Sequence, residues 1–93
     1  VRIDPVRLGG LTPARKVAAF AELKHVAVYP VRPAEVGAQL AAGVVHGRMC
    51  EHVDWFEELF IGGPRFEVQQ LVVPSDHGLG LRVHEPAAAK YRV

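Results

Sequence analysis

Apolar runs in the first half of the chain predict three short strands. Residues 1–4 alternate in polarity and are β-branched, and residues 26–29 form an apolar run that Pro30 closes. Residues 48–53 are the third candidate. A stretch of helical length separates each run from the next, so the pattern predicts βαβ units of a parallel sheet.

Two helices are predicted between these strands. The first is expected to begin at Thr12, whose hydroxyl suits a capping position, and to end near residues 24–25. Its helical spacing places Phe20 on the inward face. The second helix is expected to begin at Pro33 and to end at Gly43, a residue type typical of helix ends.

The rhythm changes after residue 53. One or two helical turns are expected over residues 54–60, followed by short strands and a short terminal helix. The two residues between the first two of these strands, Gln69 and Gln70, are unfavourable for a hairpin turn. No repeat or linker indicates a second domain, so the chain is divided into βα units (residues 1–53) and a tail (residues 54–93).

Composition and charge argue against several classes of protein. With 49% hydrophobic and 23% charged residues, the chain matches ordinary globular proteins, and disorder is excluded. A net charge of +1 gives no electrostatic reason for a nucleic-acid or anionic-membrane partner. The longest apolar stretch, residues 36–45, is far shorter than the roughly 20 residues that span a bilayer. The single cysteine, Cys50, suits a reducing compartment, so a cytoplasmic location is expected.

The size of the chain conflicts with this composition. A single domain of 93 residues is marginal without disulfides or metal, yet the abundance of Val, Leu and Ala is typical of strands and helices covered on both sides. The chain also opens on Val1, without an initiator Met or a leader segment. We therefore expect a fragment whose missing part completes the core.

Several motifs occur together as they do in one family. They are Asp-Pro-Val-Arg-Leu-Gly-Gly-Leu-Thr at residues 4–12, the helices at 14–23 and 34–42, Glu51, Asp-Trp-Phe at 54–56, Val-Pro at 73–74, Gly-Leu-Gly at 78–80 and Ala-Lys-Tyr at 89–91. Over nearly its whole length the chain resembles the C-terminal part of the barrel in the enolase superfamily. The most similar branch holds mandelate racemase, muconate lactonizing enzyme and the sugar-acid dehydratases.

The resemblance implies an α/β fold that is a partial TIM-type (β/α) barrel. It would comprise the last three parallel strands, two helices and a tail that returns toward a capping domain. A complete barrel needs eight strands and about 250 residues, so the chain by itself cannot close one. The implied partners are the remainder of the barrel, the capping domain and further copies in a homo-oligomer.

The resemblance also implies a reaction. In this family a Mg²⁺-bound carboxylate substrate, such as an acid sugar, loses the proton next to its carboxylate, and racemisation, cycloisomerisation or water loss follows. Asp4 takes the position of the dyad aspartate, and Glu51 takes that of the carboxyl on the oxyanion side. The position of the dyad histidine is Val31, which cannot move a proton. The Mg²⁺ ligands are expected upstream, so the chain alone is expected to be inactive.

Structural roles compete with these assignments. Asp4 also suits a strand-end carboxylate that caps a turn or pairs with Arg7, and Glu51 suits a buried carboxyl paired with Arg48 or His52. For the whole protein, the alternatives are a diverged, non-catalytic relative kept for binding or assembly, an inactive fragment that acts only as a structural or assembly piece, and an independent small α/β domain.

A zinc site is the weakest hypothesis. It would use His46, Cys50 and His52, whose spacing matches no standard zinc pattern. Cys50 lacks a base partner in the sequence, which argues against a nucleophile.

Overall fold

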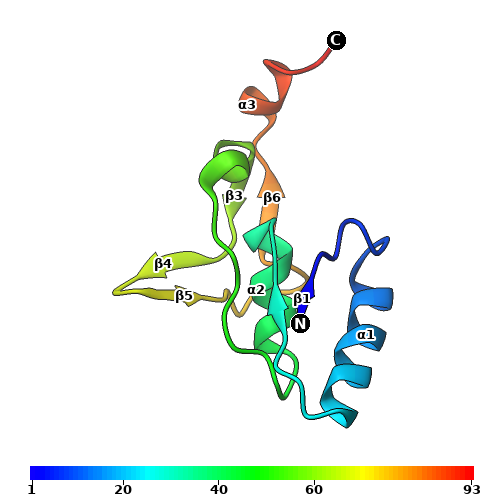
Figure 1. Cartoon of the computed structure of the whole chain (residues 1–93). Coiled ribbons are helices and arrows are strands. Elements are labelled where there is room, and N and C mark those ends of the chain that lie inside the picture. Colours follow the sequence, from blue (N-terminus) through cyan, green and yellow to red (C-terminus); the bar gives the residue numbers. More distant parts are fainter.

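The computed structural model describes all of residues 1–93, which form an α/β half followed by a tail of antiparallel ribbons (Figure 1). The α/β half contains β1 (Arg2–Ile3), α1 (Leu11–Leu23), β2 (Tyr29–Pro30) and α2 (Ala34–Ala42). The tail contains the 3₁₀ helix η1 (Asp54–Leu59), β3 (Phe60–Gly62), β4 (Arg65–Glu67), β5 (Gln70–Val72), β6 (Leu81–Val83) and α3 (Glu85–Ala89).

Three chain segments run parallel in the first half. Strands β1 and β2 pair in parallel, and residues 47–51 continue the arrangement on the other side of β2. There, Val28 forms a parallel bridge with Gly47, and the amide of Glu51 donates to the carbonyl of Pro30 at 2.9 Å. The predicted parallel order is confirmed, but the regular third strand predicted over residues 48–53 is wrong. The segment bonds to β2 through isolated contacts, so no continuous ladder forms.

The beginning of α1 differs from the prediction. Gly10 is the capping residue, and the side chain of Thr12 makes no capping hydrogen bond. The preceding loop is closed by the amide of Gly10, which donates to the carbonyl of Pro5 at 2.7 Å. Because Gly10 has a φ of 121°, the chain can turn sharply into the helix, and the first turn begins before Thr12. The predicted helix ends are confirmed, with α1 ending at Leu23 and α2 capped by Gly43.

Small side chains on α1 allow it to lie close to the sheet. The core cluster consists of Ile3, Ala14, Ala18, Ala21, Val28 and Leu40. Phe20 was expected to face inward but is 62% exposed, and the ammonium of Lys24 lies 5.7 Å from its ring centroid. Consecutive residues are rotated by about 100° around the helix axis. Because Ala14, Ala18 and Ala21 face the core, Phe20 points away from it.

The tail is built from two separate antiparallel pairs, β3 with β6 and β4 with β5. The β4–β5 hairpin extends away from the body of the molecule (Figure 1). Its turn residues are Val68 and Gln69, one position earlier than predicted, and their φ angles are 41° and 63°. The helical turns predicted over residues 54–60 are confirmed by η1.

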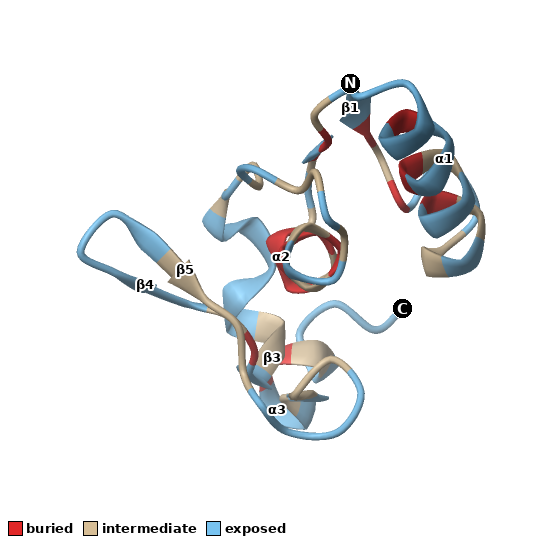
Figure 2. Ribbon diagram, turned by 90° about the horizontal axis from the view of Figure 1, so that it is seen from below, coloured by how far each residue is buried: buried red, intermediate tan, exposed pale blue.

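Buried residues are concentrated in the α/β half (Figure 2). Of the 14 buried residues, all but Gly63 and Ala87 precede residue 54. The radius of gyration is 13.8 Å, whereas a compact domain of this length has about 12 Å. No helix combines the length and apolarity needed to cross a membrane.

Candidate functional site

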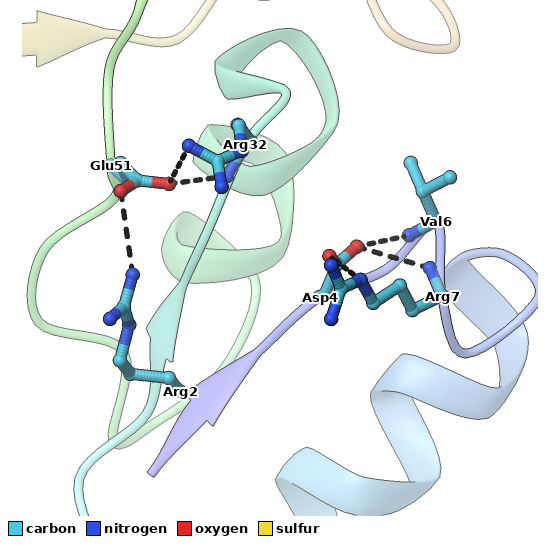
Figure 3. A network of polar contacts seen from close by, with 6 residues as sticks. All are labelled: Arg2, Asp4, Val6, Arg7, Arg32 and Glu51. Carbon is cyan, nitrogen blue, oxygen red and sulfur yellow. Dashed lines mark hydrogen bonds and ion pairs between the residues drawn. The ribbon is translucent and has the colours of Figure 1, made fainter.

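The carboxyl ends of the three parallel segments lie in a row. Asp4 follows β1, Val31 follows β2, and Glu51 lies at the end of the third segment. The amide of Val31 donates to the carbonyl of Ile3 at 2.8 Å, and the amide of Glu51 donates to that of Pro30 at 2.9 Å. These bonds set the order of the three ends, with the β2 end in the middle. In Figure 3, Arg32 lies between Glu51 and Asp4.

Asp4 is held by its own loop. Its Oδ1 accepts hydrogen bonds from the amides of Val6 at 3.0 Å and Arg7 at 3.1 Å. Its Oδ2 lies 3.4 Å from Nε of Arg7. Asp4 therefore has the turn-capping and Arg7-pairing contacts considered from the sequence, and no hydrogen bond joins it to Glu51 (Figure 3).

Glu51 is held by two arginines from other segments. Nη2 of Arg2 lies 3.4 Å from Oε1, while the amide of Arg32 donates to Oε2 at 3.3 Å and Nη1 of Arg32 lies 3.8 Å from the same oxygen. The partners considered from the sequence, Arg48 and His52, are wrong, because His52 pairs with Glu57 instead. Arg48 forms no ion pair with Glu51, whose two ion-pair partners are Arg2 and Arg32.

Arg32 connects this site to the tail. Its guanidinium lies 5.3 Å from the ring centroid of Trp55 in η1, a cation–π arrangement. Sequence reasoning missed both Arg2 and Arg32 as site residues, although signals for each exist. Arg2 precedes Asp4 by two residues in an extended segment and so shares its face, and Arg32 directly follows the end of β2.

Charged side chains gather at this edge. Arg2, Arg7 and Arg32 face the two carboxylates of Asp4 and Glu51, and the carboxylate of Glu35 is close enough to raise the pKa of the neighbouring Cys50. Val31 contributes no ionisable group at the middle position. The arrangement can therefore bind and orient an anion, but it offers no imidazole to move a proton.

Cys50 lies beside the site but is poorly suited to act as a nucleophile. Burial, reinforced by the charges of Glu51 and Glu35, raises the pKa of its thiol to about 11. Its Sγ donates to the carbonyl of Glu51 at 3.3 Å. The thiol is therefore protonated at neutral pH, whereas the nucleophilic form of a cysteine is the thiolate.

The residues of this chain do not fit a metal centre. Nowhere in it do three His, Cys, Asp or Glu side chains gather in a way that could hold an ion. The rings of His46 and His25 lie 6.3 Å apart, while His52 stacks on Phe66 at 5.6 Å. For Mg²⁺, which prefers oxygen ligands, the two candidate carboxylates already receive arginine and amide donors.

A separate cavity lies on another side of the Cys50 segment. It has a volume of about 510 Å³ and lies between α2 and the β4–β5 hairpin, where Cys50, His52 and Phe66 contribute to its walls. Neither Asp4 nor Glu51 lines it. The candidate site is thus a charged edge, separate from the apolar cavity.

Comparisons with known proteins agree on one family. The family model described as "Enolase C-terminal domain-like" matches residues 1–87. Among solved structures, the chain is similar to L-talarate dehydratase from Polaromonas sp. JS666, complexed with Mg and L-glucarate, at 32% identity over 92% of this chain, with a TM-score of 0.85. It is also similar to L-talarate/galactarate dehydratase from Salmonella typhimurium LT2, at 27% identity over 96% of the chain, with a TM-score of 0.88.

A third similar structure is an enolase of the mandelate racemase subgroup from Agrobacterium tumefaciens, at 28% identity over 97% of the chain, with a TM-score of 0.84. The chain spans only about a quarter of these proteins, namely 24%, 22% and 26% of their respective lengths. No curated protein sequence matches it.

Proposed function

The chain belongs to the enolase C-terminal domain-like family, and from this premise we propose that it is the C-terminal part of a Mg²⁺-dependent enzyme acting on acid sugars. The proposed reaction removes the proton next to a substrate carboxylate. Racemisation, cycloisomerisation or water loss would follow. Water loss is favoured because two of the similar structures are dehydratases.

One observation carries this proposal. Asp4, Val31 and Glu51 end three neighbouring parallel segments at a common edge, and the carboxyl ends of parallel strands are where barrel enzymes place their catalytic groups. Two carboxylates and three arginines gather at that edge, where a charged substrate would meet them.

The roles proposed for this chain are positioning and charge stabilisation. Asp4, fixed by two backbone amides, would present a rigid negative group at the β1 end, and Glu51 would act on the oxyanion side of the substrate. Magnesium, when bound, would stabilise the charge that develops on the substrate carboxylate, and its ligands would come from outside this chain. With Val31 at the middle position, the base that takes the proton would also come from outside it.

The test compares the chain alone with the longer protein proposed to contain it, each supplied with Mg²⁺ and a panel of acid sugars. We expect turnover only from the longer protein. There, Asp4→Asn should reduce kcat by about a hundred-fold or more, the usual scale of a lost electrostatic group in an active site. Asp76→Asn, in an exposed loop of the tail, is the matched control and should leave kcat unchanged. Turnover by the chain alone, or full activity of Asp4→Asn, would contradict the proposal.

Val31 favours a second candidate, a relative that keeps the fold for binding or assembly without catalysis. The two candidates differ in whether the longer protein turns over an acid sugar. If the protein is a working enzyme with another base, Val31→His leaves its turnover nearly unchanged. If the native protein turns over nothing in the acid-sugar panel, the non-catalytic candidate replaces the enzyme.

A further inference from the structure

We propose that Arg2 and Arg32 form a binding site for the carboxylate of an acid sugar, and that the Glu51 side chain occupies this site when no ligand is present. The proposal deepens the proposed function by naming residues that would recognise the substrate class. It does not depend on catalysis, because a non-catalytic relative would keep the same site.

The geometry is that of a carboxylate held between two guanidinium groups. Arg2 approaches Oε1 of Glu51 at 3.4 Å from β1, and Arg32 approaches Oε2 at 3.8 Å from the end of β2. The planar, permanently charged guanidinium is the side-chain group best matched to a carboxylate. Two segments far apart in the sequence thus supply cations to one position that already accommodates a carboxylate.

Glu51 can give up this position at small cost. The side chains of Arg2 and Arg32 are 72% and 45% exposed, and ion pairs as exposed as these contribute little to stability. An incoming anion therefore reaches both cations from solvent. The two guanidinium groups attract it, and the neutral Val31 neither repels it nor competes with it.

Trp55 provides a direct reporter of the site. It is the only tryptophan in the chain, and the Arg32 guanidinium lies 5.3 Å from its ring centroid. When a ligand replaces Glu51 beside Arg32, the environment of the indole changes. Intrinsic fluorescence therefore reads out ligand binding at Arg32.

The experiment titrates the chain with glucarate, gluconate and sorbitol, which have the same carbon skeleton and two, one and no carboxylates. We expect a saturable change in Trp55 fluorescence with glucarate, a weaker one with gluconate and none with sorbitol. The glucarate response should weaken with added salt, because exposed charges are screened. Equal responses to glucarate and sorbitol would overturn the proposal.

Three variants separate binding from a structural role. Arg32→Gln should weaken glucarate binding by at least about ten-fold, the scale of a lost charged hydrogen bond. Glu51→Gln should tighten it by about five-fold, because the internal competitor loses its charge. The matched control is Arg65→Gln, since Arg65 also pairs with a glutamate (Glu67, 3.6 Å) but lies in the hairpin, and it should change the affinity less than two-fold.

The Glu51→Gln result is decisive. If the arginines only brace Glu51, this variant binds glucarate no better than the native chain, and the proposal is overturned. Circular dichroism checks that each variant is folded, and Arg32→Lys, which keeps the charge, should recover part of the affinity if Arg32→Gln is unfolded. Glucarate binding without turnover in the longer protein would reject the proposed enzyme and leave this site intact, so the two failures are distinguishable.

Discussion

The two halves of the chain differ in how they bury their apolar side chains. In residues 1–53, two helices pack on parallel segments, and the core cluster from Ile3 to Leu40 lies entirely there. In residues 54–93, η1 and the β4–β5 hairpin leave large side chains in solvent, including Trp55 at 63%, Phe66 at 63% and Val68 at 95% exposure. The family model matches residues in both halves, so the similarity to the family does not depend on how well each half buries its own side chains.

This difference indicates that the α/β half is stabilised by its own contacts, whereas the tail depends on contacts with other surfaces. The α/β half has its own core and gathers the charged edge, so its geometry should persist in the chain alone. The tail has few buried contacts of its own, and an exposed apolar ribbon is stable only when something covers it. The predictions below test this division.

The largest expected effect is in the core of the first half. Leu40→Ala should lower the free energy of unfolding by about 3 kcal/mol, because it removes a side chain that is only 3% exposed and leaves a cavity. Val83→Ala in the tail, where the side chain is 51% exposed, should cost less than about 1 kcal/mol. Urea unfolding measures both. Equal costs would mean that the two halves share one core, contrary to this comparison.

The ionisation of the Cys50 thiol depends on how deeply the α/β half buries it, so it tests the packing of that half. Since burial raises its pKa from 9.0 to about 11, the thiolate fraction near pH 8 should be about a hundred-fold smaller than for a free thiol. The folded state keeps its proton more tightly, so the contribution of Cys50 to stability is full below pH 9 and is lost as the pH rises toward 11.

Alkylation rates of Cys50, measured from pH 7 to pH 11 with and without urea, test this. Slow reaction in the folded chain and fast reaction in urea at pH 8 is the expected result. If urea did not change the rate at pH 8, the thiol would be accessible to the reagent in the folded chain, contrary to this prediction.

A smaller effect is expected at the β1 end. Asp4→Ala should destabilise the α/β half by about 1 kcal/mol, because the amides of Val6 and Arg7 lose their acceptor. Asp4→Asn keeps an acceptor oxygen and should cost clearly less. Thermal unfolding of the two variants compares them. Equal costs would mean that the charge, through Arg7, matters more than the capping bonds.

The smallest effect is expected in the hairpin turn. Val68 and Gln69 both have positive φ angles, which are unfavourable for a β-branched residue and favourable for Asn and Gly. Replacing them together by Asn and Gly should stabilise the hairpin by less than about 1 kcal/mol, because the entropy that Gly loses on folding offsets part of the relieved left-handed strain. Amide exchange in β4 and β5 should slow while that in α1 is unchanged. Slower exchange in α1 as well would show that the two halves unfold together.

The elements of the first half could be predicted from the sequence because local signals determine them. Pro33 and Gly43 bound α2, and the apolar run before Pro30 marks the segment that pairs with β1. The start of α1 was misjudged because a flexible glycine, Gly10, turns the chain earlier than the stronger capping residue Thr12.

The site was harder to predict because its contacts are tertiary. The position of Asp4 could be recognised, since its partners lie within three residues. The partners of Glu51 lie 49 and 19 residues away, in Arg2 and Arg32, and only the parallel order of the segments brings them together. Composition placed the hairpin turn one residue too late, at Gln69 and Gln70, because pairing between β4 and β5 overrides the turn preference of the residues.

The most direct test of the account is the register of the three parallel segments, measured by NMR in the chain alone. Scalar couplings across hydrogen bonds should join the amide of Val31 to the carbonyl of Ile3, and the amide of Glu51 to that of Pro30. These two couplings are the result the account predicts, because they align the ends that carry Asp4, Arg32 and Glu51. Couplings that showed antiparallel pairing of β1 with β2, or a Glu51 amide bonded elsewhere, would contradict it.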